Sequence, residues 1–286
     1  MALCAVKPIL IKPPSKHKTR TWKFAGEFLI RKQFQKDQVK FGAWTREQII
    51  ELGPTFIKLG QIASSRVDLY PLEFTRELES LQDDVPPIDR DTIIDMIETH
   101  VNSGTFSYFD HEPFKSASIG QVHKATLQNG KEVVVKLRRP KIYEIMKSDT
   151  DNIKQIVAFL EKVGIDTGTN TGYVLDESID YLLAETDYEQ ETKNAKKFRK
   201  SLKKIDWMKI PKVHEQLCTP DMIVMEYVPS EKLYDITDPK VNRKKVCEAL
   251  INSYVIQTMD KGFFHADPHP GNLGFSSDGK LVFYDF

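Results

Sequence analysis

Hydrophobic positions recur at the three- and four-residue spacing of amphipathic helices over 22–104. The positions are Phe24, Phe28, Ile30, Phe34, Ile49, Ile50, Phe56, Ile57, Leu59, Phe74, Leu78 and Leu81. Gly53-Pro54 and Tyr70-Pro71 are typical of helix starts, and the Pro-rich segment 84–89 is typical of a turn. The pattern therefore predicts a helical N-terminal region without strands.

From Thr105 onward the pattern changes to short runs that are rich in Val and aromatic residues. These runs cover 105–110, 120–127 and 132–137, and the last two are joined by a segment containing Asn129-Gly130. Because Asn-Gly is a strong signal for a tight hairpin turn, we expect an antiparallel sheet to begin here.

Helical spacing returns over 141–163 and again over 174–202. Two further strands are predicted at 210–213 and 222–228, and a last helix over 241–261. Helices, hairpin, helices, strands and helix in this order predict an α+β fold.

The composition narrows the class of protein. With 286 residues, of which 40% are hydrophobic, the chain can bury a sizeable core. Its 41 basic and 41 acidic residues cancel, so we expect no nucleic-acid partner attracted by a net field. Three cysteines are too few for a disulfide framework, and no run approaches the roughly 20 apolar residues of a membrane span.

The first 26 residues carry several lysines but no Asp or Glu. Two interpretations remain open, an organellar targeting segment and a disordered basic tail. Pro8, Pro13 and Pro14 disfavour the amphipathic helix of a targeting segment, so we predict a disordered tail over 1–21.

The motif with the most candidate catalytic and metal-binding residues lies near the C-terminal end of the chain. Asp267 follows His265 by two residues, Asn272 comes five residues later, and Asp285 follows a predicted strand. This is the spacing of a phosphotransferase catalytic loop and its metal-binding Asp. Asp267 could orient the proton of an attacking hydroxyl, while Asn272 and Asp285 could hold Mg²⁺ on nucleotide phosphates. A plain polar loop and a zinc cluster of His265, Asp267 and His269 remain alternatives, but neither needs Asp285.

A predicted strand upstream carries one lysine, Lys136, after Val133-Val134-Val135. A lysine at this place suits a cation that reaches the α- and β-phosphates of a nucleotide, although most strand lysines are simply solvated. The preceding hairpin bears Lys115, Ala117, Gly120 and Val122 where a glycine-rich phosphate loop would stand, but it keeps a single glycine. Glu185, Asp187 and Glu191 on the predicted helix 174–202 are candidate carboxylate partners or an exposed acidic stretch.

Together these residues resemble the UbiB family of atypical protein-kinase-like proteins, also called aarF or ABC-one kinases. Four motifs occur in the family's order, namely Lys58-Leu59-Gly60-Gln61, the segment 116–123, Glu185-Thr186-Asp187, and the segment 265–272. The resemblance covers about residues 22 to 286.

The resemblance implies a role for most of these residues. Lys136 and Glu191 look like the nucleotide-positioning ion pair, Asp267 like the catalytic-loop Asp, and Asn272 and Asp285 like the metal ligands. It also implies that Lys58 pairs with Glu185, that Gln61 lies on the same helix face as Lys58, and that the helical extension covers the place where a protein substrate would bind. The cofactors implied are ATP and Mg²⁺.

After the basic tail over 1–21, the resemblance implies three segments: a helical extension over 22–104, a kinase-like small lobe with a helical insertion over 105–230, and the start of a large lobe over 231–286. The chain stops at Phe286, where an Asp-Phe-Gly motif would continue into an activation segment, so we expect the large lobe to be truncated. Lys115 and Ser116 stand where many relatives have alanines, which weakens any inference about nucleotide selectivity from this loop.

The function expected from this resemblance is an atypical kinase or ATPase linked to quinone or isoprenoid-lipid metabolism. The alternatives are a non-catalytic regulator that binds nucleotide or lipid, and a truncated inactive fragment. The partners expected are a nucleotide and a lipid or quinone precursor, with membrane contact but no transmembrane span. The location stays open between the cytoplasm and an organelle, either mitochondrion or plastid.

Overall fold

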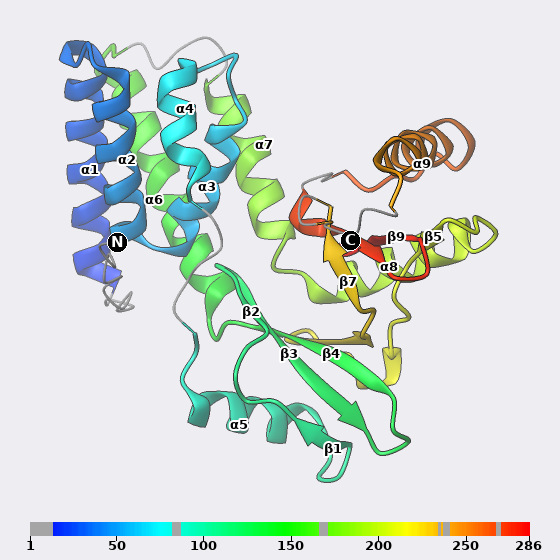
Figure 1. Ribbon diagram of the computed structural model, residues 1–286. Helices are drawn as coiled ribbons and strands as arrows, with labels where there is room; N and C mark the ends of the chain where they lie inside the picture. The colour runs from blue at the N-terminus through cyan, green and yellow to red at the C-terminus, as the bar shows by residue number, and fades with distance from the viewer. Residues whose placement is uncertain (1–13, 82–86, 166–170, 234–235, 237–240, 267–269) are drawn as a thin grey trace, which may run out of the picture. The chain divides into compact units, whose positions relative to one another are not determined.

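The computed structural model describes residues 14–81, 87–165, 171–233, 236, 241–266 and 270–286 (Figure 1). The chain forms two compact units. The first contains 1–88, 115–121 and 138–186, and the second contains 89–114, 122–137 and 187–286. The domain boundaries expected from the sequence stay a prediction.

The first unit is a helical bundle. Its helices are α1 (Pro14–Phe34), α2 (Gln38–Leu52), α3 (Pro54–Ser64), α4 (Leu72–Glu79), α6 (Ile142–Lys162) and α7 (Thr171–Ala184), and it also holds the short strand β2 (Lys115–Ser116). Phe56, Phe74 and Leu78 are buried at its centre, as the helical spacing predicts, and Phe41, which was not among the predicted positions, is buried with them. Aromatic rings dominate this core, with the centroids of Phe41 and Phe74 5.0 Å apart.

Local sequence signals set the ends of these helices. Asp37 caps α2 by accepting a hydrogen bond from the amide of Lys40 at 3.1 Å. Gly53 has a φ of 106°, which a side chain would disfavour, and Pro54 then opens α3. Helix α1 begins at Pro14 and so covers the last part of the tail predicted to be disordered. Proline is tolerated there because the first helical residue needs no amide donor.

Gly60 on α3 allows two elements to approach closely. A Cβ at this position would lie 2.5 Å from Cδ1 of Leu81 and 3.1 Å from Cδ1 of Ile49. The glycine of the Lys58-to-Gln61 motif therefore has a packing role in the bundle.

A buried carboxylate joins three helices of the first unit. Asp149 on α6 accepts a hydrogen bond from the hydroxyl of Thr55 on α3 at 2.6 Å. Its other oxygen lies 2.8 Å from Nε2 of His17 on α1. Because Thr55 and Asp149 are both almost fully buried, these contacts fix the helix that carries Lys58 against its neighbours.

The second unit contains an antiparallel sheet with the strand order β1-β3-β4-β6. The strands are β1 (Phe106–Phe109), β3 (Gly120–Leu127), β4 (Glu132–Arg138) and β6 (Met222–Glu226), and α5 (Arg90–His100) precedes them. Burial alternates along β4, where Val133, Val135 and Leu137 are buried on one face. Strand β4 is central, and its pairing with β6 places Lys136 opposite Ile223.

A second sheet in this unit has the order β5-β9-β8-β7. Its strands are β5 (Met208–Lys209), β7 (Ser230–Lys232), β8 (Leu273–Ser276) and β9 (Leu281–Phe283). Phe198 and Leu202 of α8 (Tyr188–Leu202) pack with Leu273, Leu281 and Phe283 in one core. Helix α9 (Arg243–Val255) continues into a π-helical turn (Ile256–Asp260).

Two predicted elements differ from the structure. The helix predicted over 174–202 is two helices, because α7 ends at Ala184 and Asp187 caps α8 by accepting from the amide of Gln190 at 2.9 Å. The strand predicted at 210–213 lies earlier, at β5, and Val213 makes only an isolated bridge with Met225. Pro211, which lacks an amide donor, falls within the predicted strand.

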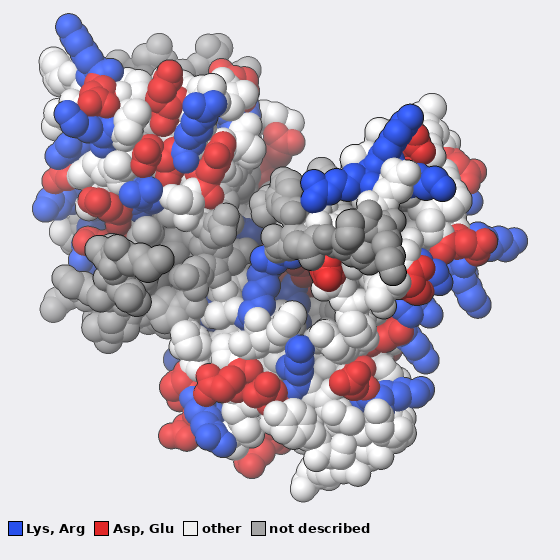
Figure 2. Space-filling model, in the orientation of Figure 1, with Lys and Arg blue, Asp and Glu red and all other residues white. Residues whose placement is uncertain are grey.

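Basic and acidic side chains are interspersed over the described residues of the face in Figure 2. Among the described helices, none is long and apolar enough to cross a bilayer.

The buried contacts of Asp149 generate a stability prediction. Asp149→Ala leaves the Thr55 hydroxyl without its acceptor inside the bundle, so we expect the unfolding free energy to fall by about 2–4 kcal/mol. The urea midpoint of the helical circular dichroism signal measures this. The matched control is Asp151→Ala on the same helix, whose exposed pair with Lys147 contributes less than about 1 kcal/mol. Equal midpoints for the two variants would contradict a structural role for Asp149.

Candidate functional site

Lys136 lies at the centre of a three-residue charge cluster in the second unit. Its Nζ is 2.8 and 2.9 Å from the two carboxylate oxygens of Glu191. The same Nζ is 2.9 Å from Oδ1 of Asp285. The ammonium thus donates to two carboxylates that lie 94 positions apart in the chain (285 − 191).

Three different elements bring these side chains together. Lys136 projects from the face of β4 opposite to the buried valines, and Glu191 lies in the first turn of α8. The buried ring of Tyr188 lies beneath, with its centroid 5.1 Å from Nζ of Lys136. A carboxylate in the first turn of a helix is also stabilised by the helix dipole.

The cluster is only partly exposed to solvent. The side chain of Lys136 is 21% exposed and that of Glu191 10%, whereas that of Asp285 is 47% exposed. Burial lowers the pKa of Lys136, but the carboxylates of Asp285 and Glu191 outweigh it, so the pKa lies well above its usual value. Lys136 is therefore charged throughout the physiological pH range, and Asp285 is the more accessible of its two partners.

The β8–β9 hairpin places Asn272 and Asp285 at the same end. Leu273 pairs with Phe283, and the amide of Tyr284 donates to the carbonyl of Asn272 at 2.9 Å. Asp285 follows with a φ of 55°, which is uncommon for a residue with a side chain. Carboxylate and amide oxygens are the ligands that Mg²⁺ prefers, so this pair fits a hard divalent cation.

The predicted catalytic residue Asp267 lies outside the described residues, as does His269 of the zinc alternative. His265, which precedes them, is buried and well anchored. Its amide donates to Oε1 of Gln257 at 2.9 Å, and its Nε2 lies 2.8 Å from the carbonyl of Tyr284. Nε2 must carry the proton to bond a carbonyl oxygen, so this nitrogen is not free to bind zinc.

The loop that stands in place of a glycine-rich loop belongs mostly to the first unit. Lys115 lies in β2, and the loop follows this strand. The loop turns tightly, since the amide of Ala117 donates to the carbonyl of Gly120 at 2.8 Å. Ile119 is buried against Ile142, Met146 and Leu182. The loop is thus anchored by its own apolar side chain. Val122 lies further along β3, in the second unit.

Three hydrogen bonds of this region, made by two arginines, were not predicted from the sequence. Arg138 donates to the carbonyl of Thr186 at 2.9 Å. Arg139 donates through Nε to the carbonyl of Ala117 at 2.9 Å and through Nη2 to the hydroxyl of Ser116 at 3.0 Å. The signal that could have identified them is a pair of arginines directly after the Lys136 strand and before Pro140, where the strand must end.

The motif residues of the helical extension have separate partners. Lys58 on α3 lies 2.9 Å from Oε2 of Glu185, so the pair that the resemblance implies is present. Gln61, one turn further on, donates to the carbonyl of Leu81 at 2.7 Å. Asp187 caps α8, so the two acidic residues of the Glu-x-Asp motif make different contacts.

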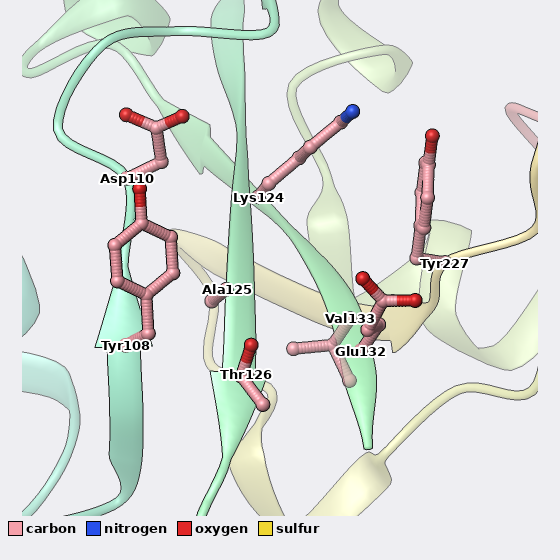
Figure 3. A pocket seen from close by; sticks show the side chains of 8 residues that line it. All are labelled: Tyr108, Asp110, Lys124, Ala125, Thr126, Glu132, Val133 and Tyr227. Atoms are coloured by element: carbon pink, nitrogen blue, oxygen red, sulfur yellow. The ribbon is translucent and has the colours of Figure 1, made fainter. Parts of the chain in front are cut away.

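A cavity of about 230 Å³ in the second unit does not contain Lys136 (Figure 3). Its lining residues are Tyr108, Asp110, Lys124, Ala125, Thr126, Glu132, Val133 and Tyr227. Nζ of Lys124 lies 4.7 Å from the ring centroids of both Phe114 and Tyr227. The two aromatic rings beside this cavity are therefore already in cation–π contact with Lys124. We assign no function to the cavity.

Comparisons with known proteins identify the family and the fold of the chain. A family model described as "ABC1 atypical kinase-like domain" matches residues 80–286, more than half of the chain. The Arabidopsis thaliana protein ACTIVITY OF BC1 COMPLEX KINASE 7, chloroplastic, is 38% identical over 272 residues, which are 93% of this chain and 39% of that protein. An uncharacterized protein of Synechocystis is 36% identical over 277 residues, 93% of this chain and 47% of that protein.

A solved structure has a similar fold. The complex of Rv3197 with erythromycin from Mycobacterium tuberculosis matches with a TM-score of 0.61 and 26% identity, over 70% of this chain and 52% of that chain. The chain spans less than half the length of the two curated relatives named above. These matches confirm the kinase-like α+β fold and the family inferred from the motifs. The chain belongs to the family of ABC1 atypical kinase-like proteins.

Proposed function

We propose that this chain binds ATP with Mg²⁺ and acts as an atypical kinase or ATPase. The observation that carries the proposal is the ammonium of Lys136, held by Glu191 and Asp285 in a partly buried cluster. Exposed ion pairs are common and usually contribute little to stability. A partly buried lysine that is held by two carboxylates from separate elements is instead typical of a functional site.

The two carboxylates have different parts in this proposal. Glu191 is nearly buried and contacts Nζ with both oxygens, so it keeps the lysine extended. Asp285 is half exposed and contacts Nζ through Oδ1. Nucleotide phosphates would take the place of Asp285 at the ammonium, and Asp285 with Asn272 would then hold Mg²⁺, which neutralises phosphate charge when bound.

The remaining predicted residues complete the proposed chemistry. Asp267 would orient the attacking hydroxyl or water, as its place in the catalytic-loop motif suggests. The loop with Lys115, Ala117 and Gly120, followed by Val122, would cover the phosphates. A lipid or quinone precursor, which is expected from the family resemblance alone, is the proposed substrate. The chloroplast named for the Arabidopsis relative supports a plastid as the location.

A non-catalytic regulator is the second candidate. It is favoured by the loop, where the amide of Ala117 already bonds the carbonyl of Gly120 and only one glycine is present. Glycine-rich phosphate loops instead present backbone amides to the ligand. Nucleotide binding without any turnover by the intact protein would support the regulator over the enzyme.

Replacing the lysine tests the nucleotide site. Lys136→Ala removes the cation that would contact phosphate, so we expect ATP affinity, measured by titration calorimetry, to fall about tenfold to a hundredfold. Lys131→Ala changes an exposed lysine just before the same strand and serves as the control. An unchanged affinity in a folded Lys136→Ala variant would refute the assignment of Lys136 to phosphate binding.

Replacing the proposed metal ligand tests the Mg²⁺ site. Asp285→Asn keeps the shape of the side chain but loses the charge that a hard cation requires, so we expect Mg²⁺ to stop enhancing nucleotide binding. The control is Asp278→Asn in the exposed β8–β9 turn. The measurement is nucleotide affinity as a function of Mg²⁺ concentration, and superimposable curves for Asp285→Asn and the unsubstituted protein would exclude Asp285 as a ligand.

The catalytic role of Asp267 has a kinetic signature. We expect Asp267→Asn to bind ATP with normal affinity but to turn it over roughly 10²–10⁴-fold more slowly, the usual contribution of a positioned acid or base. Phosphate release under saturating ATP measures the turnover. If the variant retained full turnover, the proposed role of Asp267 would be wrong.

A further inference from the structure

We propose that Arg139 is a positioning residue that fixes the loop over 115–120. Its side chain would hold the loop backbone in one conformation, whereas a glycine-rich loop would be flexible. The effect on nucleotide binding rests on the function proposed above, but the effect on the loop itself does not.

Arg139 makes hydrogen bonds to the loop at three positions. Its Nε donates to the carbonyl of Ala117 and its Nη2 to the hydroxyl of Ser116, at 2.9 and 3.0 Å. Its own backbone amide donates to the carbonyl of Ile119 at 2.8 Å. One residue therefore contacts the segment before the turn, at Ser116 and Ala117, and Ile119 within the turn that the Ala117–Gly120 hydrogen bond closes.

The geometry of a guanidinium suits this task. Its N–H groups lie in one plane and point in fixed directions. Two bonds to adjacent residues therefore fix the orientation of the loop as well as its distance from Arg139. A lysine at the same place would present a single rotating ammonium at the end of a flexible chain. Charged donors also bind more strongly than neutral ones, and the arginine is partly buried.

The loop sequence explains why such an anchor is needed. Ala117 and Ser118 are buried or half-buried in the turn, and neither has the freedom of glycine. Ile119 fixes the apolar side of the turn in the core, but it does not restrain the polar backbone of Ser116 and Ala117. Arg139 supplies that restraint from the segment that follows Lys136 by three residues.

The test separates a specific anchor from a general contribution to folding. Arg139→Lys keeps the charge and the backbone bond to Ile119 but loses the paired side-chain bonds. We expect hydrogen exchange of the Ala117 amide, followed by mass spectrometry on the whole chain, to become about tenfold faster. Ser116→Ala removes one acceptor only, so its effect should be smaller, and adding it to Arg139→Lys should change little.

Arg46→Lys is the matched control. Arg46 also makes two side-chain contacts within the first unit, to Glu77 at 3.3 Å and to Ser80 at 3.1 Å, but both lie on or beside α4. This variant should leave exchange over 115–120 unchanged. If Arg139→Lys left loop exchange unchanged, or raised exchange equally in α3 and α6, the proposed positioning role would be wrong.

Nucleotide affinity forms a second arm of the experiment. If the unsubstituted protein binds ATP, Arg139→Lys should weaken binding several-fold while leaving the urea midpoint near that of Arg46→Lys, and an unchanged affinity would overturn the link between loop and nucleotide. If the unsubstituted protein binds no ATP, the proposed function fails. The exchange measurement then still decides whether Arg139 fixes the loop.

Discussion

The ion cluster of Lys136, Glu191 and Asp285 is the interaction around which the candidate site of the second unit is built. Partly burying three charges costs desolvation free energy, and their mutual attraction offsets that cost only when the atoms stay within hydrogen-bonding distance. Each partner must therefore be held by a rigid element. The central strand β4 holds the lysine, the first turn of α8 holds Glu191, and the end of the β8–β9 hairpin holds Asp285.

This requirement explains features that would otherwise be unrelated. The cap formed by Asp187 fixes where α8 begins, and hence which side chain of its first turn faces Lys136. His265 is anchored to the carbonyl of Tyr284, the residue before Asp285, so the segment before the catalytic-loop motif and the end of β9 are fixed together. The site is assembled by contacts to backbone groups as much as by its charged side chains.

The sequence predicted those parts of the fold that depend on local pattern. The hairpin at Asn129-Gly130 and the helices of the N-terminal region follow from spacing and turn chemistry, whereas the pair of Lys136 and Glu191 was implied only by the family resemblance. The break at 185–187 was missed because Asp187 can equally continue a helix or cap the next one, and only tertiary packing decides. The contacts of Asp149 and Arg139 were missed because each joins residues far apart in sequence, with no periodic signal.

Glycine and arginine represent two ways to build a loop over phosphates. Glycines let the backbone approach the ligand closely, but they increase the entropy that must be lost when the loop becomes ordered. A loop held by Arg139 and Ile119 has already lost much of that entropy. In exchange, fewer of its amides can bind a ligand, because an amide such as that of Ala117 is already bonded within the turn. In the proposed function, such a loop would contribute shape and pre-organisation but fewer direct amide contacts, so more of the phosphate charge would be met by Lys136 and Mg²⁺.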